Sequence, residues 1–258
     1  MFRRAGEGRL PGITPYGALR GPLDKRSSLR RAHGAGRRTG IIVPLSKFDL
    51  ALLQTEKPAF LIGVDEAGRG PLAGPVTACA AWVPPSSHSL VSPVVDDSKK
   101  LSPRRREEAL RIMRASGVRF GFGFARSAEI DSENILEATF NAMGRAVRRL
   151  LCYTGAGPEG VLVLVDGPHR IKRLDVRAQR PVVGGDARSL SIAAASIYAK
   201  VIRDRWMGVL DVRYPGYGLA GHKGYGTAAH LEALKRLGPC PQHRVSFAPV
   251  RAAAGAPR

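Results

Sequence analysis

Four acidic residues stand at or just beyond the ends of segments that are predicted to be strands. They are Asp65, Glu66, Asp166 and Asp186. Carboxylate oxygens are the ligands that Mg²⁺ and Mn²⁺ prefer, and two such ions about 3.5–4 Å apart can activate a water and stabilise the leaving oxygen of a phosphodiester. An Asp beside Gly also fits an ordinary turn, and Asp186 could instead cap a helix. The four acids are therefore candidate ligands of two divalent cations, Mn²⁺ or Mg²⁺, although chain order alone does not bring them together.

A glycine-rich turn follows the first acid pair and reads Gly68-Arg69-Gly70. Glycines let the backbone approach a ligand closely and present its N–H groups, and the Arg guanidinium is a fork that suits phosphate. The tripeptide is common in ordinary turns. Its place two residues after a paired Asp-Glu makes it a candidate substrate-binding element.

Two further basic segments could contact nucleic acid. Lys99 and Lys100 precede a predicted helix, whose N-terminus favours anions. Lys223 and Tyr225 lie in a Gly-rich loop, where a tyrosine can stack on a base or a sugar. Taken alone, the lysines also fit a solvated charge pair and the tyrosine an ordinary loop aromatic.

The elements that must position these residues follow from the apolar patterns. Apolar runs predict strands at 60–64, 75–83, 118–125, 161–165 and 179–183. Helical spacing and cap residues predict helices at 47–57, 103–115, 133–151, 188–211 and 227–237. Residues 84–95 and 214–225 have the composition of loops. The order of these elements indicates an α/β layered fold with a central mixed sheet flanked by helices.

The chain is strongly basic. Its 258 residues include 41 Lys and Arg against 21 Asp and Glu, a net charge of +20 that suits a polyanion such as nucleic acid. Residues 1–40 carry +8 of this charge and are rich in Gly and Pro. We expect them to be a disordered basic extension, more readily a nonspecific tail than a targeting peptide. The rest of the chain keeps +12, so its body is basic as well.

Composition excludes other classes of protein. No apolar run approaches the ~20 residues of a membrane span. Cys79, Cys152 and Cys240 show neither CxxC nor Cys/His spacing, which argues against a disulfide framework and a structural zinc site. A reducing compartment, the cytoplasm, is the expected location. Residues 251–258 are expected to form a loose tail.

Seven segments, in this order, resemble the motifs of type 2 ribonuclease H, the ribonuclease HII family. The resemblance covers roughly residues 58–250. It is carried by GVDEAGRGPLAGPV (63–76), DDSKKLSPRRREE (96–108), EIDSENILEAT (129–139), LVLVDGP (162–168), GGDARSLSIAAASIYAKVIRDRWM (184–207), YPGYGLAGHKGYGTAAHLEAL (214–234) and HRVSFAPV (243–250).

The resemblance implies a fold and an activity. It implies a ribonuclease-H-like catalytic domain over residues 58–213, and a helical C-terminal part over 214–250 that binds substrate through a loop and a helix. It also implies a metal-dependent endonuclease that hydrolyses the RNA strand of RNA–DNA hybrids. Such an enzyme incises on the 5′ side of a single ribonucleotide embedded in duplex DNA and leaves 3′-hydroxyl and 5′-phosphate ends.

The resemblance further implies roles for individual residues. The four acids become the metal ligands, the turn at residues 68–70 senses the 2′-hydroxyl, and Tyr225 stacks on the sugar of the next deoxynucleotide. Backbone groups that read the 2′-hydroxyl need no base code. Our candidates for the phosphate contacts, which should weaken with salt, are Lys99, Lys100 and Lys223.

Three alternatives stay open on the sequence. Ribonuclease HIII, a sister type, normally has GKG in place of GRG and carries a folded N-terminal domain. A basic binding module without catalysis would not need four acids, which repel phosphate unless metals are bound. Another two-metal nuclease of the same fold, such as a resolvase, would not need the GRG turn or Tyr225. We expect a monomer whose partners are hybrid and ribonucleotide-containing duplexes, with no membrane.

Overall fold

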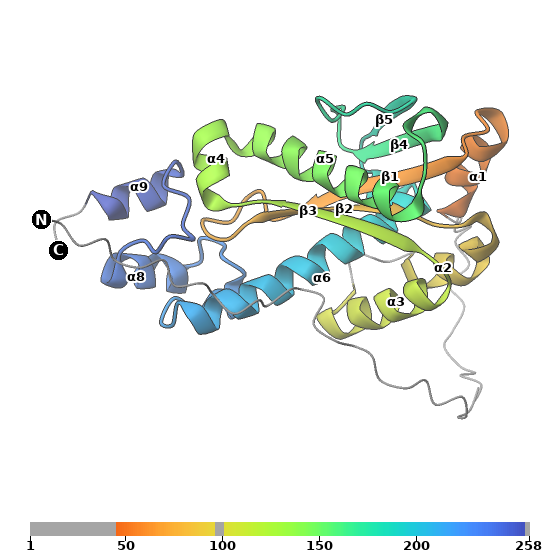
Figure 1. Ribbon diagram of the computed structural model, residues 1–258. Coiled ribbons are helices and arrows are strands. Elements are labelled where there is room, and N and C mark those ends of the chain that lie inside the picture. The colour runs from red at the N-terminus through yellow and green to blue at the C-terminus, as the bar shows by residue number, and fades with distance from the viewer. Residues whose placement is uncertain (1–44, 96–100, 256–258) are drawn as a thin grey trace, which may run out of the picture. The chain divides into compact units, whose positions relative to one another are not determined.

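The computed structural model describes residues 45–95 and 101–255. At the centre of these residues is a five-stranded sheet with the order β3-β2-β1-β4-β5 (Figure 1). The strands are β1 (Phe60–Ala67), β2 (Val76–Trp82), β3 (Arg119–Ala125), β4 (Val161–Asp166) and β5 (Ala178–Val182). β1, β2 and β3 pair antiparallel, whereas β1, β4 and β5 pair parallel, so the sheet is mixed. The predicted fold class and all five predicted strands are confirmed.

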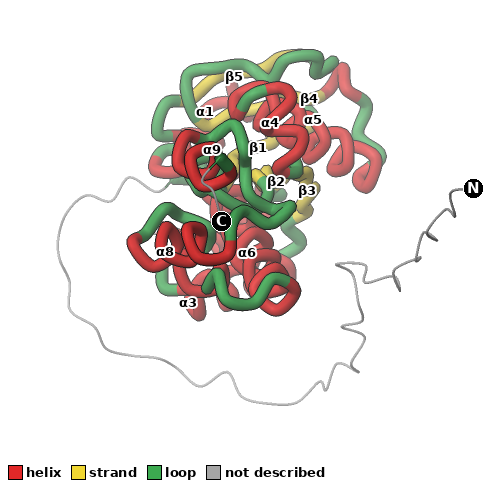
Figure 2. Tube along the Cα trace, turned by 90° about the vertical axis from the view of Figure 1, so that its left-hand side faces the viewer, coloured by secondary structure: helices red, strands yellow, loops and turns green. Residues whose placement is uncertain are grey.

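Helices cover both faces of the sheet. They are α1 (Ser46–Thr55), α2 (His88–Val95), α3 (Pro103–Ala115), α4 (Ser127–Glu133), α5 (Ile135–Thr154), α6 (Leu190–Arg213), α7 (Leu219–His222), α8 (Ala228–Leu237) and α9 (Ala248–Ala254). α5 packs on β2 and β3, and α6 packs on β1 and β2. Figure 2 shows the strands between these two helices. None of the helices in the described ranges is long and apolar enough to cross a membrane.

The central strand β1 lies very close to the first turn of α6. A Cβ on Gly63 would lie 2.1 Å from the backbone carbonyl carbon of Ser191, so no larger residue fits there. The next residues of α6 are small, and Ala193, Ala194 and Ala195 are fully buried on this side of the sheet. Because the two backbones meet directly, the end of β1 that carries the first acid pair has little freedom to shift.

One helix lies where the sequence predicts a loop. Residues 84–95 contain Ser, Pro and His residues that are typical of loops, yet α2 forms there. It buries Val91 and Val95 in the core beneath the sheet. Tertiary packing therefore overrides local composition at this segment.

The helix predicted at 133–151 is confirmed as α5, and a separate helix that the sequence did not predict, α4, comes directly before it. Asn134 separates them with a φ of +78°, a conformation that Asn tolerates better than most residues. Its side-chain oxygen accepts hydrogen bonds from Leu136 N at 2.9 Å and Glu137 N at 3.1 Å. Asn134 thus acts as the N-cap of α5.

The C-terminal part is helical, as expected, and extends further than predicted. α7 forms within the predicted loop 214–225. α9 continues to Ala254, so the expectation of a loose tail from residue 251 is wrong for residues 251–254. The reason is Val250, which is fully buried against Leu72 and Leu234 and anchors α9. The basic extension at residues 1–40 lies outside the described residues.

Candidate active site

Two acids from distant parts of the chain meet at the carboxyl ends of neighbouring parallel strands. Val64 of β1 pairs with Val165 of β4, so the residues that follow, Asp65 and Asp166, lie side by side in the two strands. Both strands are buried over most of their length, and Figure 1 shows β1 and β4 next to each other in the sheet. Asp65 is itself buried, with 6% of its surface exposed.

The electrostatics of these acids show that three of them interact. Burial raises the pKa of Asp65 well above its usual value, and the charges of Glu66 and Asp166 raise it further. Burial also raises the pKa of Glu66, which Arg69 lowers and Asp166 raises. Buried carboxylates that repel one another in this way form a site that a cation would stabilise.

Local hydrogen bonds orient the first acid pair. Oδ1 of Asp65 accepts a hydrogen bond from Glu66 N at 2.7 Å, and the hydroxyl of Ser196 on α6 donates to the same carboxylate. Oε1 of Glu66 accepts from Nη1 of Arg69 at 3.4 Å. The acid pair is therefore fixed from the strand, from α6 and from the glycine-rich turn.

The backbone next to Asp186 is hydrogen-bonded to Asp166. Asp186 belongs to a single 3₁₀ turn, Gly185–Ala187, which connects β5 to α6. Gly185 N donates a 2.7 Å hydrogen bond to Oδ1 of Asp166, which places the residue before Asp186 directly on the acid cluster. The Asp186 side chain is buried, with 9% of its surface exposed.

The chemistry of the donor set fits a hard divalent cation. All four candidate ligands are carboxylates, and oxygen ligands suit Mg²⁺ and Mn²⁺. Within the described ranges, however, no three His, Cys, Asp or Glu side chains are already spaced as the ligands of one metal ion. The backbone N–H groups of Glu66 and Gly185 instead engage two of the carboxylates. The strands and turns thus bring the acids together, while the carboxylates of Asp65 and Asp166 accept hydrogen bonds from backbone N–H groups.

The glycine-rich turn connects the acids to the predicted stacking tyrosine. Gly68 has a φ of +96°, and a Cβ there would lie 1.9 Å from Nε of Arg203. Arg69 is half exposed beside Glu66. A Cβ on Gly70 would lie 3.6 Å from Cε1 of Tyr225, which is an ordinary contact distance. The structure therefore places Glu66, the turn and Tyr225 in one continuous row.

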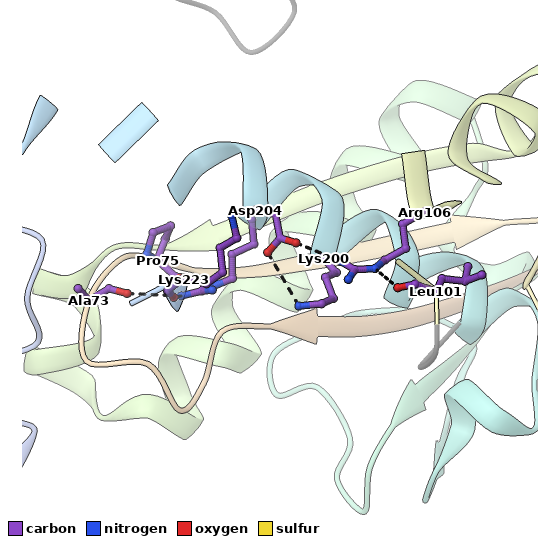
Figure 3. A network of polar contacts seen from close by, with 8 residues as sticks. Ala73, Pro75, Leu101, Arg106, Lys200, Asp204 and Lys223 are labelled. Carbon is purple, nitrogen blue, oxygen red and sulfur yellow. Dashed lines mark hydrogen bonds and ion pairs between the residues drawn. The ribbon is translucent and has the colours of Figure 1, made fainter. Parts of the chain in front are cut away.

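Two buried arginines, neither of which was singled out from the sequence, hold this row together. On α6, Arg203 donates to Ala73 O at 3.4 Å, Pro75 O at 3.3 Å and Lys223 O at 2.9 Å (Figure 3). It thus joins the segment after the turn to the loop of Lys223 and Tyr225. Both arginines stand inside motif segments, but their burial depends on contacts that the sequence does not display.

Arg244 is the second of these arginines and is fully buried. It donates to Gly68 O at 2.6 Å, Arg69 O at 2.7 Å and Gly74 O at 2.8 Å. Burial, followed by the charge of Arg203, lowers its pKa to about 9, so it remains a cation at neutral pH. A fixed positive charge therefore lies directly beneath the turn.

Of the three candidate phosphate-binding lysines, one lies within the described residues. Lys223 is partly exposed in the loop before Tyr225. Lys99 and Lys100 lie outside the described residues, but the chain resumes just beyond them at Leu101. There Arg106 of α3 donates to Leu101 O at 3.1 Å and pairs with Asp204 of α6 at 3.0 Å (Figure 3).

A small pocket opens beside the acids. Its lining includes Glu66, Arg69 and Asp166, residues of α5, and His169. The ring of His169 meets Phe140 edge-on at 6.1 Å. His169 was not a candidate from the sequence. Its place three residues after Asp166 is the one signal that could have suggested it.

Comparisons with known proteins agree with this geometry. A family model described as ribonuclease HII matches residues 62–250, most of the chain. The chain belongs to the ribonuclease HII family. A ribonuclease HII from Halorhodospira halophila is 53% identical over 193 residues, which cover 74% of this chain and 93% of the relative. A ribonuclease HII from Geobacillus kaustophilus is 50% identical over 194 residues, 74% of this chain and 69% of the relative.

Solved structures show the same fold. The ribonuclease H2 from Pyrococcus horikoshii is 27% identical with a TM-score of 0.61, and the match covers 76% of this chain and 97% of that one. A ribonuclease HIII crystallised in complex with Mn²⁺ has a TM-score of 0.65 over 76% of this chain and 70% of that one. At 19% identity, this second likeness concerns the fold alone.

Membership of the ribonuclease HII family decides among the alternatives. The chain is an endoribonuclease of the ribonuclease H type, which acts on RNA–DNA hybrids and belongs to a metal-dependent group of enzymes. A binding module without catalysis and a resolvase are thereby set aside. The match to ribonuclease HII likewise favours that type over its sister, ribonuclease HIII.

Proposed function

We propose that this ribonuclease HII enzyme incises duplex DNA on the 5′ side of a single embedded ribonucleotide, in addition to hydrolysing the RNA strand of hybrids. The products carry 3′-hydroxyl and 5′-phosphate ends. A 2′-hydroxyl distinguishes RNA from DNA at the site, so recognition depends weakly on base sequence.

The row that runs from the acids through the turn to Tyr225 carries this proposal. Arg69 contacts Glu66 at 3.4 Å, and Gly70 lies against the ring of Tyr225. An enzyme that only cleaves long hybrids needs no fixed element that reads one RNA–DNA junction. Here the backbone of the turn would read the 2′-hydroxyl while Tyr225, 49% exposed, stacks on the sugar of the next deoxynucleotide.

The four acids would hold two divalent cations, Mn²⁺ or Mg²⁺. Such cations, when bound, supply an activated water and stabilise the departing 3′-oxygen. The charge of Asp166 raises the pKa of both Asp65 and Glu66, which supports the view that the three carboxylates are close enough to share cations. Asp186 would be the fourth ligand, and the residue before it, Gly185, donates a hydrogen bond to Asp166. The Mn²⁺ in the ribonuclease HIII crystal supports a divalent cation of this kind.

Basic side chains would supply affinity for the substrate. Lys99, Lys100 and Lys223 would contact phosphates on either side of the junction, and affinity would then fall with salt. The enzyme would act as a monomer in the cytoplasm, in the repair of ribonucleotides left in DNA by replication. Its net charge of +20 supports a nucleic-acid partner.

A 5′-labelled DNA duplex with one ribonucleotide tests the proposal. The enzyme is incubated with it in Mg²⁺, in Mn²⁺ or in EDTA, and product length is read to the nucleotide. We expect cation-dependent cleavage on the 5′ side of the ribonucleotide, products that a polymerase extends, and no cleavage by Asp166→Asn. Cleavage of an RNA–DNA hybrid alone, or cleavage on the 3′ side, would overturn the proposal.

A further inference from the structure

Three histidines stack beneath the loop that carries Tyr225. The rings of His222 and His230 are 4.3 Å apart and nearly parallel, and the rings of His230 and His243 are 5.2 Å apart. His230 is fully buried and His243 is 2% exposed, whereas Tyr225 above them is 49% exposed. Buried titratable rings packed together are unusual enough to require an account of their hydrogen bonds.

The hydrogen bonds of the two buried rings assign their protons. Nδ1 of His230 lies 2.9 Å from Tyr225 O, and a carbonyl can only accept, so Nδ1 carries hydrogen. In a neutral ring Nε2 of His230 then accepts, and its partner is Nε2 of His243 at 3.1 Å. Nδ1 of His243 is therefore the acceptor of that ring. It accepts a hydrogen bond from Cys240 N at 3.0 Å, and the Cys240 thiol sulfur lies 3.2 Å away.

His222 completes the stack with its own assignment. Its Nδ1 accepts from Gly224 N at 3.1 Å, so Nε2 donates to Tyr217 O at 2.8 Å. All the polar ring atoms of the stack thus have complementary partners when the three rings are neutral. Burial favours this state, because it lowers the pKa of His230 and lowers that of His243 to about 4.

The result is a directed chain of hydrogen bonds that ends on the loop. It runs from Cys240 through His243 and His230 to the carbonyl oxygen of Tyr225. An additional proton on either buried ring would place two N–H donors face to face. The three bonds of this chain are therefore all made only when both buried rings are neutral and carry their hydrogens in this arrangement.

We propose that His230, held in register by His243, is a positioning residue that fixes the backbone of Tyr225 and thereby the stacking face of its ring. The inference rests on the stacking role given to Tyr225 in the proposed function. His230 touches neither substrate nor metal in this account. It acts through the loop alone.

Two isosteric substitutions of His230 separate positioning from packing. His230→Asn keeps a nitrogen donor where Nδ1 lies, facing Tyr225 O, and loses the bond to His243. His230→Gln keeps a polar group where Nε2 lies, facing His243, and loses the donor to Tyr225 O. We expect His230→Gln to raise KM for the single-ribonucleotide duplex about fivefold to tenfold with a smaller change in kcat. We expect His230→Asn to keep a KM close to that of the wild type, because it retains the donor to Tyr225 O.

A double-mutant cycle with Tyr225→Ala tests whether His230 acts through the tyrosine ring. We expect His230→Gln to add almost nothing to the rise in KM once the ring is gone. Additive effects, or a fall in kcat at unchanged KM in both His230 variants, would overturn the inference and leave only a packing role. If Tyr225→Ala itself leaves KM unchanged, the stacking role in the proposed function fails instead.

A measurement on the wild-type protein protects the test if a His230 variant does not fold. ¹⁵N shifts of the histidine rings distinguish a protonated from an unprotonated nitrogen. At neutral pH we expect hydrogen on Nδ1 of His230 and on Nε2 of His243. The same tautomer on both rings, or a charged ring, would overturn the chain of bonds on which the inference depends.

Discussion

Arg244 donates a 2.6 Å hydrogen bond to the carbonyl oxygen of Gly68, 176 residues away in the chain. The same guanidinium also donates to Arg69 O and Gly74 O. The C-terminal part of the chain is therefore hydrogen-bonded to the glycine-rich turn. The turn that would read the 2′-hydroxyl is thereby held by a buried cation rather than by its own sequence.

Arg244→Met should destabilise the enzyme and impair junction recognition. The substitution removes a buried charge and leaves three carbonyl oxygens, those of Gly68, Arg69 and Gly74, without this donor, so the free energy of unfolding should fall by about 3 kcal/mol. Chemical denaturation measures it. Arg251→Met is the matched control, since Arg251 is exposed and its side chain donates to Ser246 O at 3.2 Å. Equal, small effects of the two substitutions would contradict this role of Arg244.

Asp65→Asn should abolish cleavage and stabilise the metal-free protein. Activity should fall by at least about a hundredfold, because a candidate metal ligand is lost. In EDTA, the free energy of unfolding at pH 7 should rise by about 0.5–2 kcal/mol, because the buried charge and its repulsion of Glu66 and Asp166 disappear.

The sign of this effect follows from the raised pKa of Asp65. The folded protein keeps a proton on Asp65 at pH values where the unfolded chain has lost it, so the stability of the metal-free enzyme falls as pH rises above the ordinary value of 3.8. Asp65→Asn should weaken that fall. Denaturation curves at several pH values in EDTA measure it, and a less stable Asp65→Asn protein at neutral pH would contradict the account.

Metal binding should release protons and strengthen as pH rises. Burial and neighbouring charge raise the pKa of both Asp65 and Glu66, and metal ions bind the deprotonated forms. The Mg²⁺ concentration that gives half-maximal cleavage should therefore fall between pH 6 and pH 8. Calorimetric titration with Mn²⁺ in buffers of different ionisation enthalpy measures the protons released. A half-maximal concentration that is independent of pH would show that these acids do not bind the metal.

The two glycines of the turn should respond differently to alanine. A Cβ on Gly68 would lie 1.9 Å from Nε of Arg203, at a positive φ, so Gly68→Ala should destabilise the fold by about 2 kcal/mol or more. A Cβ on Gly70 meets only Tyr225 Cε1, at 3.6 Å. Gly70→Ala should therefore fold normally, and the added methyl group would lie beside the stacking ring and weaken substrate binding.

Thermal unfolding and steady-state kinetics on both variants measure the contrast. We expect a lower Tm for Gly68→Ala, and an unchanged Tm with a higher KM for Gly70→Ala. A destabilised Gly70→Ala protein, or a Gly70→Ala enzyme with unchanged kinetics on the single-ribonucleotide duplex, would contradict the place given to the turn.

The sequence was sufficient to predict the strands and the acids at their ends. The run at 161–165 is apolar without interruption because β4 is buried on both faces, so its end at Asp166 could be located. The segment of α2 could not be predicted in the same way. Its helical state comes from burial of Val91 and Val95, which depends on the rest of the fold.

The contacts that hold the site together could not be predicted either. Arg244 and Arg203 act on backbone carbonyls more than 100 residues away. Asp49 is fully buried on α1 and accepts from Ser191 N at 2.9 Å and Ser191 Oγ at 2.7 Å, which anchors the start of α6 just after Asp186. Long-range bonds of this kind leave no periodic pattern in the chain.

Single-turnover cleavage of two duplexes tests the central claim most directly. One duplex carries a single ribonucleotide and the other a continuous RNA strand, and each is offered to the wild-type enzyme and to Tyr225→Ala. We predict that the wild type cleaves both, and that loss of the stacking ring slows incision at the single ribonucleotide about tenfold more than hydrolysis of the hybrid. Equal slowing on the two substrates, or a wild-type enzyme that cleaves the hybrid alone, would contradict the account.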